Sequence, residues 1–190
     1  TDDTGVLLTE AMQAAGLDPS GALVTCVRKP GALHAFVELH IEQGPVLEAR
    51  GIPCGIVTGI AGTINWDVTL TGEANHSGTT PMSMRKDAFL GMSCFGAAIP
   101  GILERVGTEA SRITVGTVHL HPNFPHSVPG RAEFSLNCRS DTDEVMWALA
   151  EACRGELQRA AREFGLQLVI NEKSWLAGAP CHQDIVKTLE

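Results

Sequence analysis

The sequence predicts an α+β fold, in which one antiparallel sheet carries helices on a single face. Three observations support this fold class: strands marked by alternating apolar and polar residues, two long stretches with helical spacing of apolar residues, and their order along the chain. The 190 residues, 44% of them hydrophobic and 19% charged, suit one globular domain with flanking segments of another. The net charge of −8 argues against nucleic acid as a partner.

Four strands are predicted. In the first, apolar residues at positions 64, 66, 68 and 70 alternate with polar residues at 65, 67, 69 and 71. Residues 113–120 form the second strand. Residues 131–138, which alternate strictly, form the third, and residues 166–170 form the fourth. This alternation predicts a sheet with one apolar face and one polar face.

Two long helices are predicted between these strands. The first runs from about Met82 to Glu104, with Pro81 in its first turn and Pro100 as a point where it kinks or breaks. The second carries an apolar stripe from Val145 to Phe164. Asp141 or Thr142 caps its N-terminus and Gly165 ends it.

The resulting order from 64 to 171 is β-α-β-β-α-β, the ferredoxin-like arrangement. In the flanks we expect a helix over 6–15, a buried strand over 35–41, a helical turn over 46–49 and a short strand at 56–57. The predicted division is 1–61, 62–174 and 175–190, with both flanks in a second domain. The acidic start without Met indicates a chain cut from a longer one.

His40 is the first residue with chemistry to offer, because it lies between Glu38 and Glu42. A neutral imidazole binds divalent metals, and a neighbouring carboxylate can orient its other nitrogen. The alternative is a core histidine hydrogen-bonded to one of these two acids. A metal site also needs further ligands, which this run does not supply.

Three further segments carry polar side chains of interest. His76 lies on a Gly- and Thr-rich loop before a predicted helix, either as a site residue or as part of a plain connection capped by Thr79 or Thr80. His119, His121 and His126 surround one loop, and the first two share a strand face that could hold a metal. Arg139 ends a strand on the polar face, where it can bind a carboxylate or serve as an ordinary surface residue.

Six scattered cysteines lack ligand spacing, and their even count allows three disulfides, but a chain this apolar favours the reduced thiols of a cytoplasmic protein. No apolar stretch reaches the roughly 18–20 residues that span a bilayer, so we expect no membrane. The sequence contains no nucleophile elbow, phosphate-binding loop or dinucleotide fingerprint.

In combination, these motifs closely resemble the allantoate amidohydrolase / N-carbamoyl-L-amino acid hydrolase (hydantoinase/carbamoylase) family, within the wider M20 group of metallopeptidase-like enzymes. The matching segments cover nearly the whole chain: Glu38 to Pro45, Val57 to Gly62, Ala74 to Met82, Arg85 to Ala88, Val128 to Gly130 and Arg139 to Asp141. The resemblance implies a catalytic domain with two divalent metal ions, Zn²⁺ or Mn²⁺, Co²⁺ or Ni²⁺. It also implies an inserted lid that forms a homodimer.

The resemblance also implies roles for single residues. His40 is the ligand of one metal and Gln43 contacts the substrate. His76 reaches the substrate carbonyl, often in the partner subunit's site, and Arg139 clamps the substrate carboxylate. His126 stands where the family usually has Asn, and an imidazole cannot offer the donor and acceptor of an amide together.

The activity implied is hydrolysis of the linear C–N amide bond of an N-carbamoyl-L-amino acid or a ureido acid such as allantoate, with release of ammonia. The family's other metal ligands and its general base have no counterpart here. We therefore expect the chain alone to bind metal weakly and to be inactive. The alternatives are an M20 peptidase or aminoacylase, or a dimerisation module without catalysis.

Overall fold

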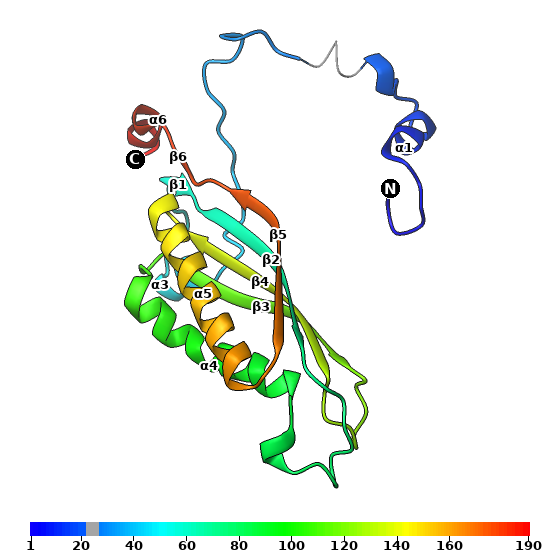
Figure 1. Cartoon of the computed structure of the whole chain (residues 1–190). Helices are drawn as coiled ribbons and strands as arrows, with labels where there is room; N and C mark the ends of the chain where they lie inside the picture. Colours follow the sequence, from blue (N-terminus) through cyan, green and yellow to red (C-terminus); the bar gives the residue numbers. More distant parts are fainter. Residues whose placement is uncertain (22–26) are drawn as a thin grey trace. The chain divides into compact units, whose positions relative to one another are not determined.

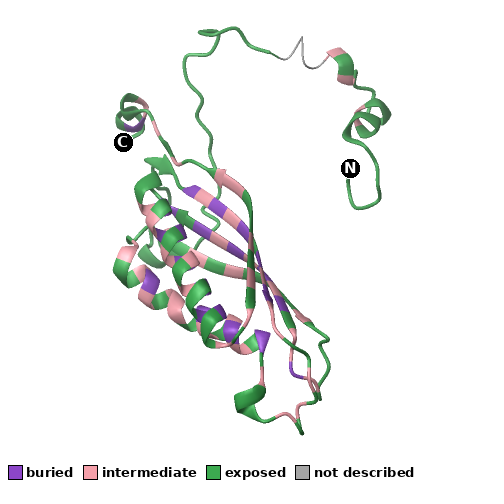
Figure 2. Cartoon of the chain, in the orientation of Figure 1, coloured by how far each residue is buried: buried purple, intermediate pink, exposed green. Residues whose placement is uncertain are grey.

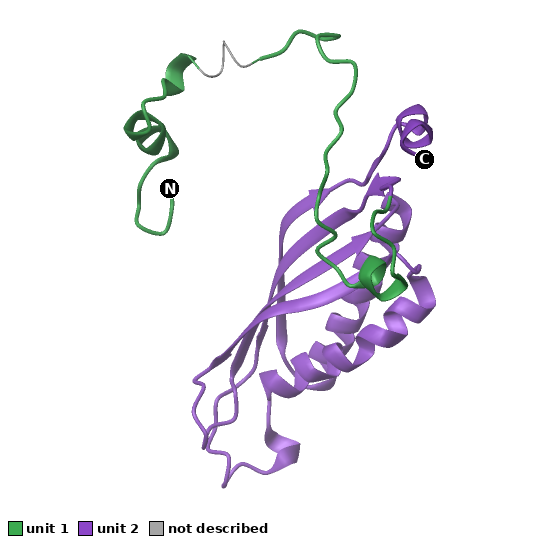
Figure 3. Ribbon diagram, turned by 180° about the vertical axis from the view of Figure 1, so that it is seen from behind, with its two compact units in different colours: residues 1–55 green, residues 56–190 purple. Residues whose placement is uncertain are grey.

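The computed structural model describes residues 1–21 and 27–190. The chain divides into two compact units, Thr1–Gly55 and Ile56–Glu190 (Figure 3). Cys26, one of the six cysteines expected to be reduced, lies outside the described residues. The other five are free thiols.

The larger unit is built on a four-stranded sheet (Figure 1). Its strands are β2 (Gly62–Thr71), β3 (Arg112–His121), β4 (Arg131–Ser140) and β5 (Gln167–Leu176). They lie in the order β3-β4-β2-β5, and every neighbouring pair is antiparallel. With α4 (Ala88–Val106) after β2 and α5 (Asp143–Glu163) after β4, the predicted β-α-β-β-α-β order is confirmed.

Both helices cover the same face of the sheet, and the core lies between them and the strands (Figure 2). On β2 and β4 every second residue is buried, because period-two alternation sends these side chains to the helix side. The rings of Phe95 on α4 and Phe134 on β4 stack with centroids 6.1 Å apart. The opposite face of the sheet is polar, as the alternation predicted.

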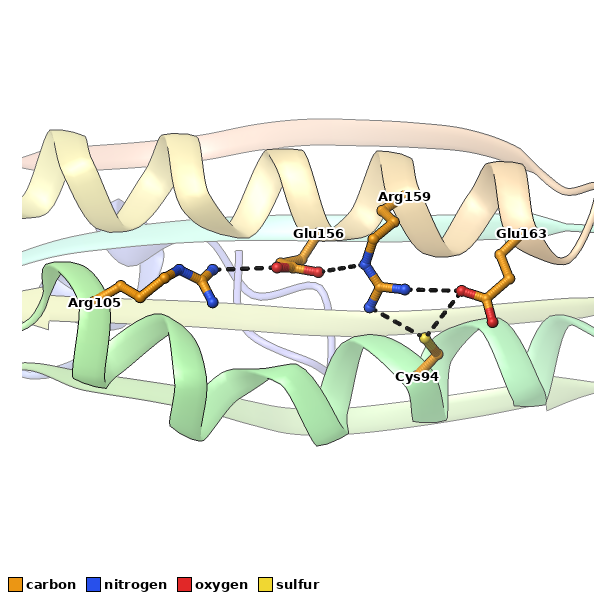
Figure 4. Close-up of polar contacts among 5 residues, drawn as sticks. All are labelled: Cys94, Arg105, Glu156, Arg159 and Glu163. Atoms are coloured by element: carbon orange, nitrogen blue, oxygen red, sulfur yellow. Dashed lines mark hydrogen bonds and ion pairs between the residues drawn. The ribbon is translucent and has the colours of Figure 1, made fainter.

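A chain of charged side chains joins the two helices on their outer side (Figure 4). Glu156 of α5 accepts from Arg105 of α4 at 3.1 Å and from Arg159 at 2.7 Å. Arg159 also donates to Glu163 at 2.8 Å and to the Cys94 sulfur at 3.4 Å. These contacts hold α4 and α5 side by side over the sheet.

The start of the first long helix was predicted wrongly. Met82–Met84 form a short 3-10 helix, η1, and α4 begins only at Ala88. Asp87 sets this start, because its Oδ1 accepts from the amides of Phe89 (3.0 Å) and Leu90 (3.2 Å). Pro100 does not break the helix, which continues to Val106.

The predicted ends of α5 are observed. Thr142 caps its N-terminus, where the Oγ1 accepts from the Val145 amide. Gly165 follows its C-terminus with φ +64°, a left-handed conformation that favours glycine. By length and composition, α4 alone among the described helices could cross a membrane. Its buried residues, however, belong to the core that packs on the sheet.

Short elements join the two ends of this unit. β1 (Gly59–Ile60) pairs antiparallel with β6 (Ala179–Pro180), and α6 (Gln183–Leu189) follows. The strand predicted at 56–57 was wrong, because the only backbone partner in this region, residues 179–180, pairs with residues 59–60 among the described residues. The domain boundaries at 61 and 174 stay a prediction.

The smaller unit contains α1 (Leu8–Ala14) and α3 (Val46–Arg50), near the predicted helical segments. The buried strand predicted over 35–41 was wrong. These residues form no strand and are exposed, with Leu39 at 94%. A strand needs a neighbour for its backbone groups, and the described part of this unit contains no other strand.

Candidate functional site

Two loops at one end of the sheet bring the candidates His76 and His126 close together in space. The loop after β2 carries His76, and the loop between β3 and β4 carries His126. His76 forms an antiparallel bridge with Ser127, and the Ser77 amide donates to the His126 carbonyl at 3.0 Å. Both histidines are exposed. We call residues 72–81 and 122–130 the tip loops.

The ring of His76 is oriented by its own loop. Its Nδ1 accepts from the Gly78 amide at 3.1 Å, so a neutral ring carries its proton on Nε2. Arg85 holds the same loop through bonds from Nε to the Thr80 carbonyl (3.0 Å) and from Nη2 to the Ser77 carbonyl (2.6 Å). The Nε2 of His76 is thus an exposed hydrogen-bond donor on a fixed loop, suited to a carbonyl oxygen.

His126 is held less tightly. Its ring packs edge-on against Phe124, with centroids 5.9 Å apart, and its backbone carbonyl anchors the other tip loop. No side-chain hydrogen bond of His126 is present among the described residues. The ring can therefore reorient toward a ligand.

Arg139 lies near the end of β4 on the polar face of the sheet, as predicted. Its Nε donates to the Asn137 Oδ1 at 3.1 Å. Asn137 in turn donates from Nδ2 to Thr63 Oγ1 at 2.8 Å and to Asn65 Oδ1 at 2.7 Å, both on β2. These bonds hold the base of the Arg139 guanidinium and leave its two Nη groups without a partner among the described residues.

The polar face is hollowed around Arg139, with a volume of about 700 Å³. The lining comes from all four strands: Asn65, Trp66, Asp67, Arg112, Thr114, Gly116, Ser135, Leu136, Asn137, Arg139 and Lys173. Sequence reasoning singled out Arg139 but missed Arg112 and Asn137. The polar positions of the alternating strands were the available signal for both.

The tip loops and Arg139 occupy opposite ends of the sheet. β4 leaves the tip loops at Arg131 and reaches Arg139 eight residues later. At about 3.3 Å per residue this separation is roughly 26 Å. One chain therefore does not bring His76 and His126 together with Arg139.

His40 and Gln43 belong to the smaller unit. His40 is exposed, and its Nδ1 contacts the neighbouring Ile41 carbonyl. The Glu42 carboxylate does not orient this ring, because it accepts from the amides of Val46 (2.8 Å) and Leu47 (3.0 Å) at the start of α3. Gln43, which lies between Glu42 and the start of α3, adopts a positive φ of 54°.

The paired histidines on β3 do not form a metal site among the described residues. His121 Nε2 lies 2.9 Å from Glu133 Oε2, and Arg131 binds the other oxygen of that carboxylate. The hydrogen bond with His121, followed by the one from Arg131, lowers the pKa of Glu133. In the described part of the chain, no three His, Cys, Asp or Glu side chains gather as metal ligands.

Residues 58–164, which include β2 to α5, match the family model of the M20 peptidase dimerisation domain. The chain belongs to this family. The M20 dimerisation-domain match covers the tip loops, strands β2, β3 and β4 and both helices, and so includes His76, His126 and Arg139.

Several relatives of the chain are named as amidohydrolases. The chain is 39% identical over its whole length to an N-carbamoyl-L-amino acid amidohydrolase of Geobacillus stearothermophilus, covering 46% of that protein. It is 32% identical over 99% of its length to the allantoate amidohydrolase of Escherichia coli, covering 45%. A solved amidase of the hydantoinase/carbamoylase family from Burkholderia multivorans matches the whole chain with a TM-score of 0.86 and 31% identity, over 44% of its own length. The chain spans less than half the length of these relatives.

Proposed function

We propose that this chain is the dimerisation domain, with flanking catalytic segments, of a metal-dependent amidohydrolase. The reaction is hydrolysis of the linear C–N amide bond of an N-carbamoyl-L-amino acid or a ureido acid such as allantoate. The observation that carries the proposal is the 39% identity to a carbamoyl amino acid amidohydrolase along the whole chain. Because the chain spans less than half of that relative, activity belongs to the longer protein.

Two side chains suit the two ends of such a substrate. The free Nη groups of Arg139 match the geometry of a carboxylate, which accepts two parallel hydrogen bonds. The Nε2 of His76 can donate to the carbonyl oxygen of the ureido group and stabilise the negative charge that develops there during attack by water. His126 and Gln43 are proposed to make further polar contacts with the substrate.

The distance between these side chains favours a site shared by two subunits. In a carbamoyl amino acid the carboxylate carbon and the ureido carbon are roughly 3–4 Å apart, because only three bonds separate them. Arg139 and the tip loops are separated by roughly 26 Å along β4. Both can act on one small substrate if the tip loops of one subunit reach the site of its partner, so the proposal includes a homodimer.

The metal site is proposed for the longer protein only. His40 offers one exposed imidazole, and the described residues supply no cluster that completes a ligand set. Two divalent ions, when bound by His40 and residues outside this chain, would make a bound water acidic enough to attack at neutral pH. The isolated chain is therefore proposed to be inactive.

Mixed dimers test the proposal directly. Full-length His76→Ala and Arg139→Ala variants should each lose most ureido-acid hydrolysis. When the two are co-folded in equal amounts, statistical exchange should return about a quarter of wild-type activity, since half of the dimers then contain one intact shared site. Ammonia release from N-carbamoyl amino acids and allantoate is the measurement.

Two results would contradict the proposal. If the mixture is as inactive as the separate variants, the residues do not act across subunits. If the full-length protein with added divalent metal releases no ammonia from any ureido acid but hydrolyses N-acyl amino acids or dipeptides, the peptidase or aminoacylase reading replaces it. Alanine substitution of His119 serves as the control, because His119 lies on β3, outside the tip loops.

A further inference from the structure

Arg112 and Arg139 lie directly opposite each other on neighbouring strands. They are Cα partners in the β3–β4 ladder, and both side chains are exposed. Both also line the hollow on the polar face of the sheet. Opposite residues on one face of an antiparallel pair have Cβ atoms about 5 Å apart, so the two positive charges are close neighbours.

No acid neutralises these two charges among the described residues. The other cations of the polar face are paired, Lys173 with Asp67 at 3.1 Å and Arg131 with Glu133. Arg112 donates only to backbone carbonyls, those of Glu109 (2.6 Å) and Ser111 (2.8 Å). Like charges placed directly opposite destabilise a sheet, so an anion bound between them would relieve the repulsion.

The donors that remain free suit carboxylates. Asn137 holds the Nε of Arg139, and the relay continues from Asn65 Nδ2 to Ser174 Oγ on β5 at 2.9 Å. Arg139 therefore offers both Nη groups. Within the described ranges, the Nε and Nη2 of Arg112 have no partner, because only its Nη1 donates to the backbone. Each guanidinium can bind a separate carboxylate.

We propose that Arg112 and Arg139 together form a dicarboxylate site, so that the enzyme prefers ureido acids with two carboxylates, such as N-carbamoyl-L-aspartate. Arg139 binds the α-carboxylate and Arg112 the side-chain carboxylate. The two carboxyl carbons of an extended four-carbon diacid lie roughly 4 Å apart because three bonds separate them, so two neighbouring guanidinium groups that start from Cβ atoms about 5 Å apart can reach one carboxylate each. The site rests on the geometry of this sheet, and its role in substrate choice rests on the proposed function.

Ligand binding to the full 190-residue chain tests the site without catalysis. Succinate and its monoamide succinamate differ by one carboxylate, and NMR shifts of the arginine Nε–H and strand amides report their affinity. Wild-type chain should bind succinate about tenfold more tightly than succinamate. Arg112→Gln should remove this preference, and Arg112→Lys should keep part of it. Equal affinities in the wild type, or a preference unchanged in Arg112→Gln, would overturn the site.

Arg131→Gln is the matched control, because Arg131 lies on the same face of β4 but is already paired with Glu133. It should leave the preference for succinate intact. If it removes the preference as Arg112→Gln does, the effect is one of net charge and the proposed site is wrong.

Hydrolysis by the full-length enzyme tests the substrate class. The ratio of kcat/KM for N-carbamoyl-L-aspartate to that for N-carbamoyl-L-asparagine should fall about tenfold in Arg112→Gln, mainly through KM. A ratio that does not change contradicts the inference. If neither compound nor allantoate is hydrolysed, the proposed function fails, and succinate binding alone then decides whether the dicarboxylate site exists.

Discussion

The Nε of Arg139 donates to the Oδ1 of Asn137 at 3.1 Å, while the Nδ2 of Asn137 donates to two side-chain acceptors on β2. This arrangement leaves the Asn137 amide only one orientation, since its oxygen must face the guanidinium. The direction of Arg139 is therefore set by the neighbouring strand as well as by its own backbone.

Asn137 is expected to act as a positioning residue for Arg139. Asn137→Ala removes the acceptor, so the guanidinium gains rotamer freedom that substrate binding must then restrict. We expect KM for a carbamoyl amino acid to rise about tenfold in the full-length enzyme, with kcat nearly unchanged. Steady-state ammonia release gives both constants.

Asn171→Ala is a suitable control for this change. Asn171 lies on β5, opposite Asp67, and is exposed. It should leave KM unchanged. A loss of kcat with constant KM in Asn137→Ala would mean that Asn137 supports the fold of the site and does not orient the carboxylate clamp.

Gly130 allows the tip loops to approach each other. A Cβ on this residue would lie 2.5 Å from the Ala74 backbone nitrogen, two residues before His76. Backbone cannot yield as a flexible side chain does, so Gly130→Ala should displace the His76 loop. We expect at least about a hundredfold loss of activity in the full-length enzyme, because small shifts of a positioned donor are costly.

Circular dichroism and thermal unfolding of the 190-residue chain should show that the sheet of Gly130→Ala still forms. Gly155→Ala on α5 provides the comparison, because an added Cβ there meets nothing within 4 Å. That change should stabilise the chain by about 0.5–1 kcal/mol through helix propensity. Full activity in Gly130→Ala would show that the tip loops need not be held this closely.

Alternation of apolar and polar residues predicted a strand correctly where the chain also supplies the neighbouring strands that pair with it. The residues at 64, 66, 68 and 70 are buried and belong to a central strand, as predicted. Over 35–41 a similarly apolar stretch predicted a strand that does not form, because pairing depends on a neighbour and not on composition. The start of α4 was missed because Asp87 was not recognised as a cap.

The residues of the candidate site also fall into those that the strand period predicts and those that it does not. Arg139 was found on the polar face because its position follows from the strand period. The roles inferred here for Asn137 and Arg112 depend on which residues oppose them across β2, β3 and β4, and a single sequence does not specify that register. His40, Gln43, His76, His126 and Arg139 all stay predictions as site residues.

The aromatic pair between α4 and β4 should carry much of the stability of the core. Phe95 is fully buried and its ring stacks on Phe134. Phe95→Ala leaves a cavity that the sheet cannot fill, so we expect a loss of about 3–5 kcal/mol. Phe89→Ala on the same helix, at an exposed position, should cost less than about 1 kcal/mol. Chemical denaturation of the 190-residue chain measures both, and equal losses would contradict the assignment of the core.

Stability should also depend on the charge of Glu156, which joins α4 to α5 (Figure 4). The hydrogen bond from Arg159 is the largest cause that lowers the pKa of Glu156 below its ordinary value of 4.5. Because the folded pKa is lower than the unfolded one, the ionised group stabilises the fold above about pH 4.5. This contribution is lost as the pH falls through the lowered pKa. Glu156→Gln should therefore melt below the wild type at about pH 7, and this difference should shrink as the pH falls below about 4.5.

Thermal unfolding across this pH range checks the prediction, with Glu151→Gln as the control. Glu151 lies on the same helix, but its side chain is 68% exposed and reaches Arg154 only at 3.5 Å. Exposed pairs of this kind contribute little, so its substitution should lower the melting temperature less at about pH 7. A gap between wild type and Glu156→Gln that stays constant from about pH 7 to about pH 3 would mean that packing, and not the carboxylate charge, accounts for the effect.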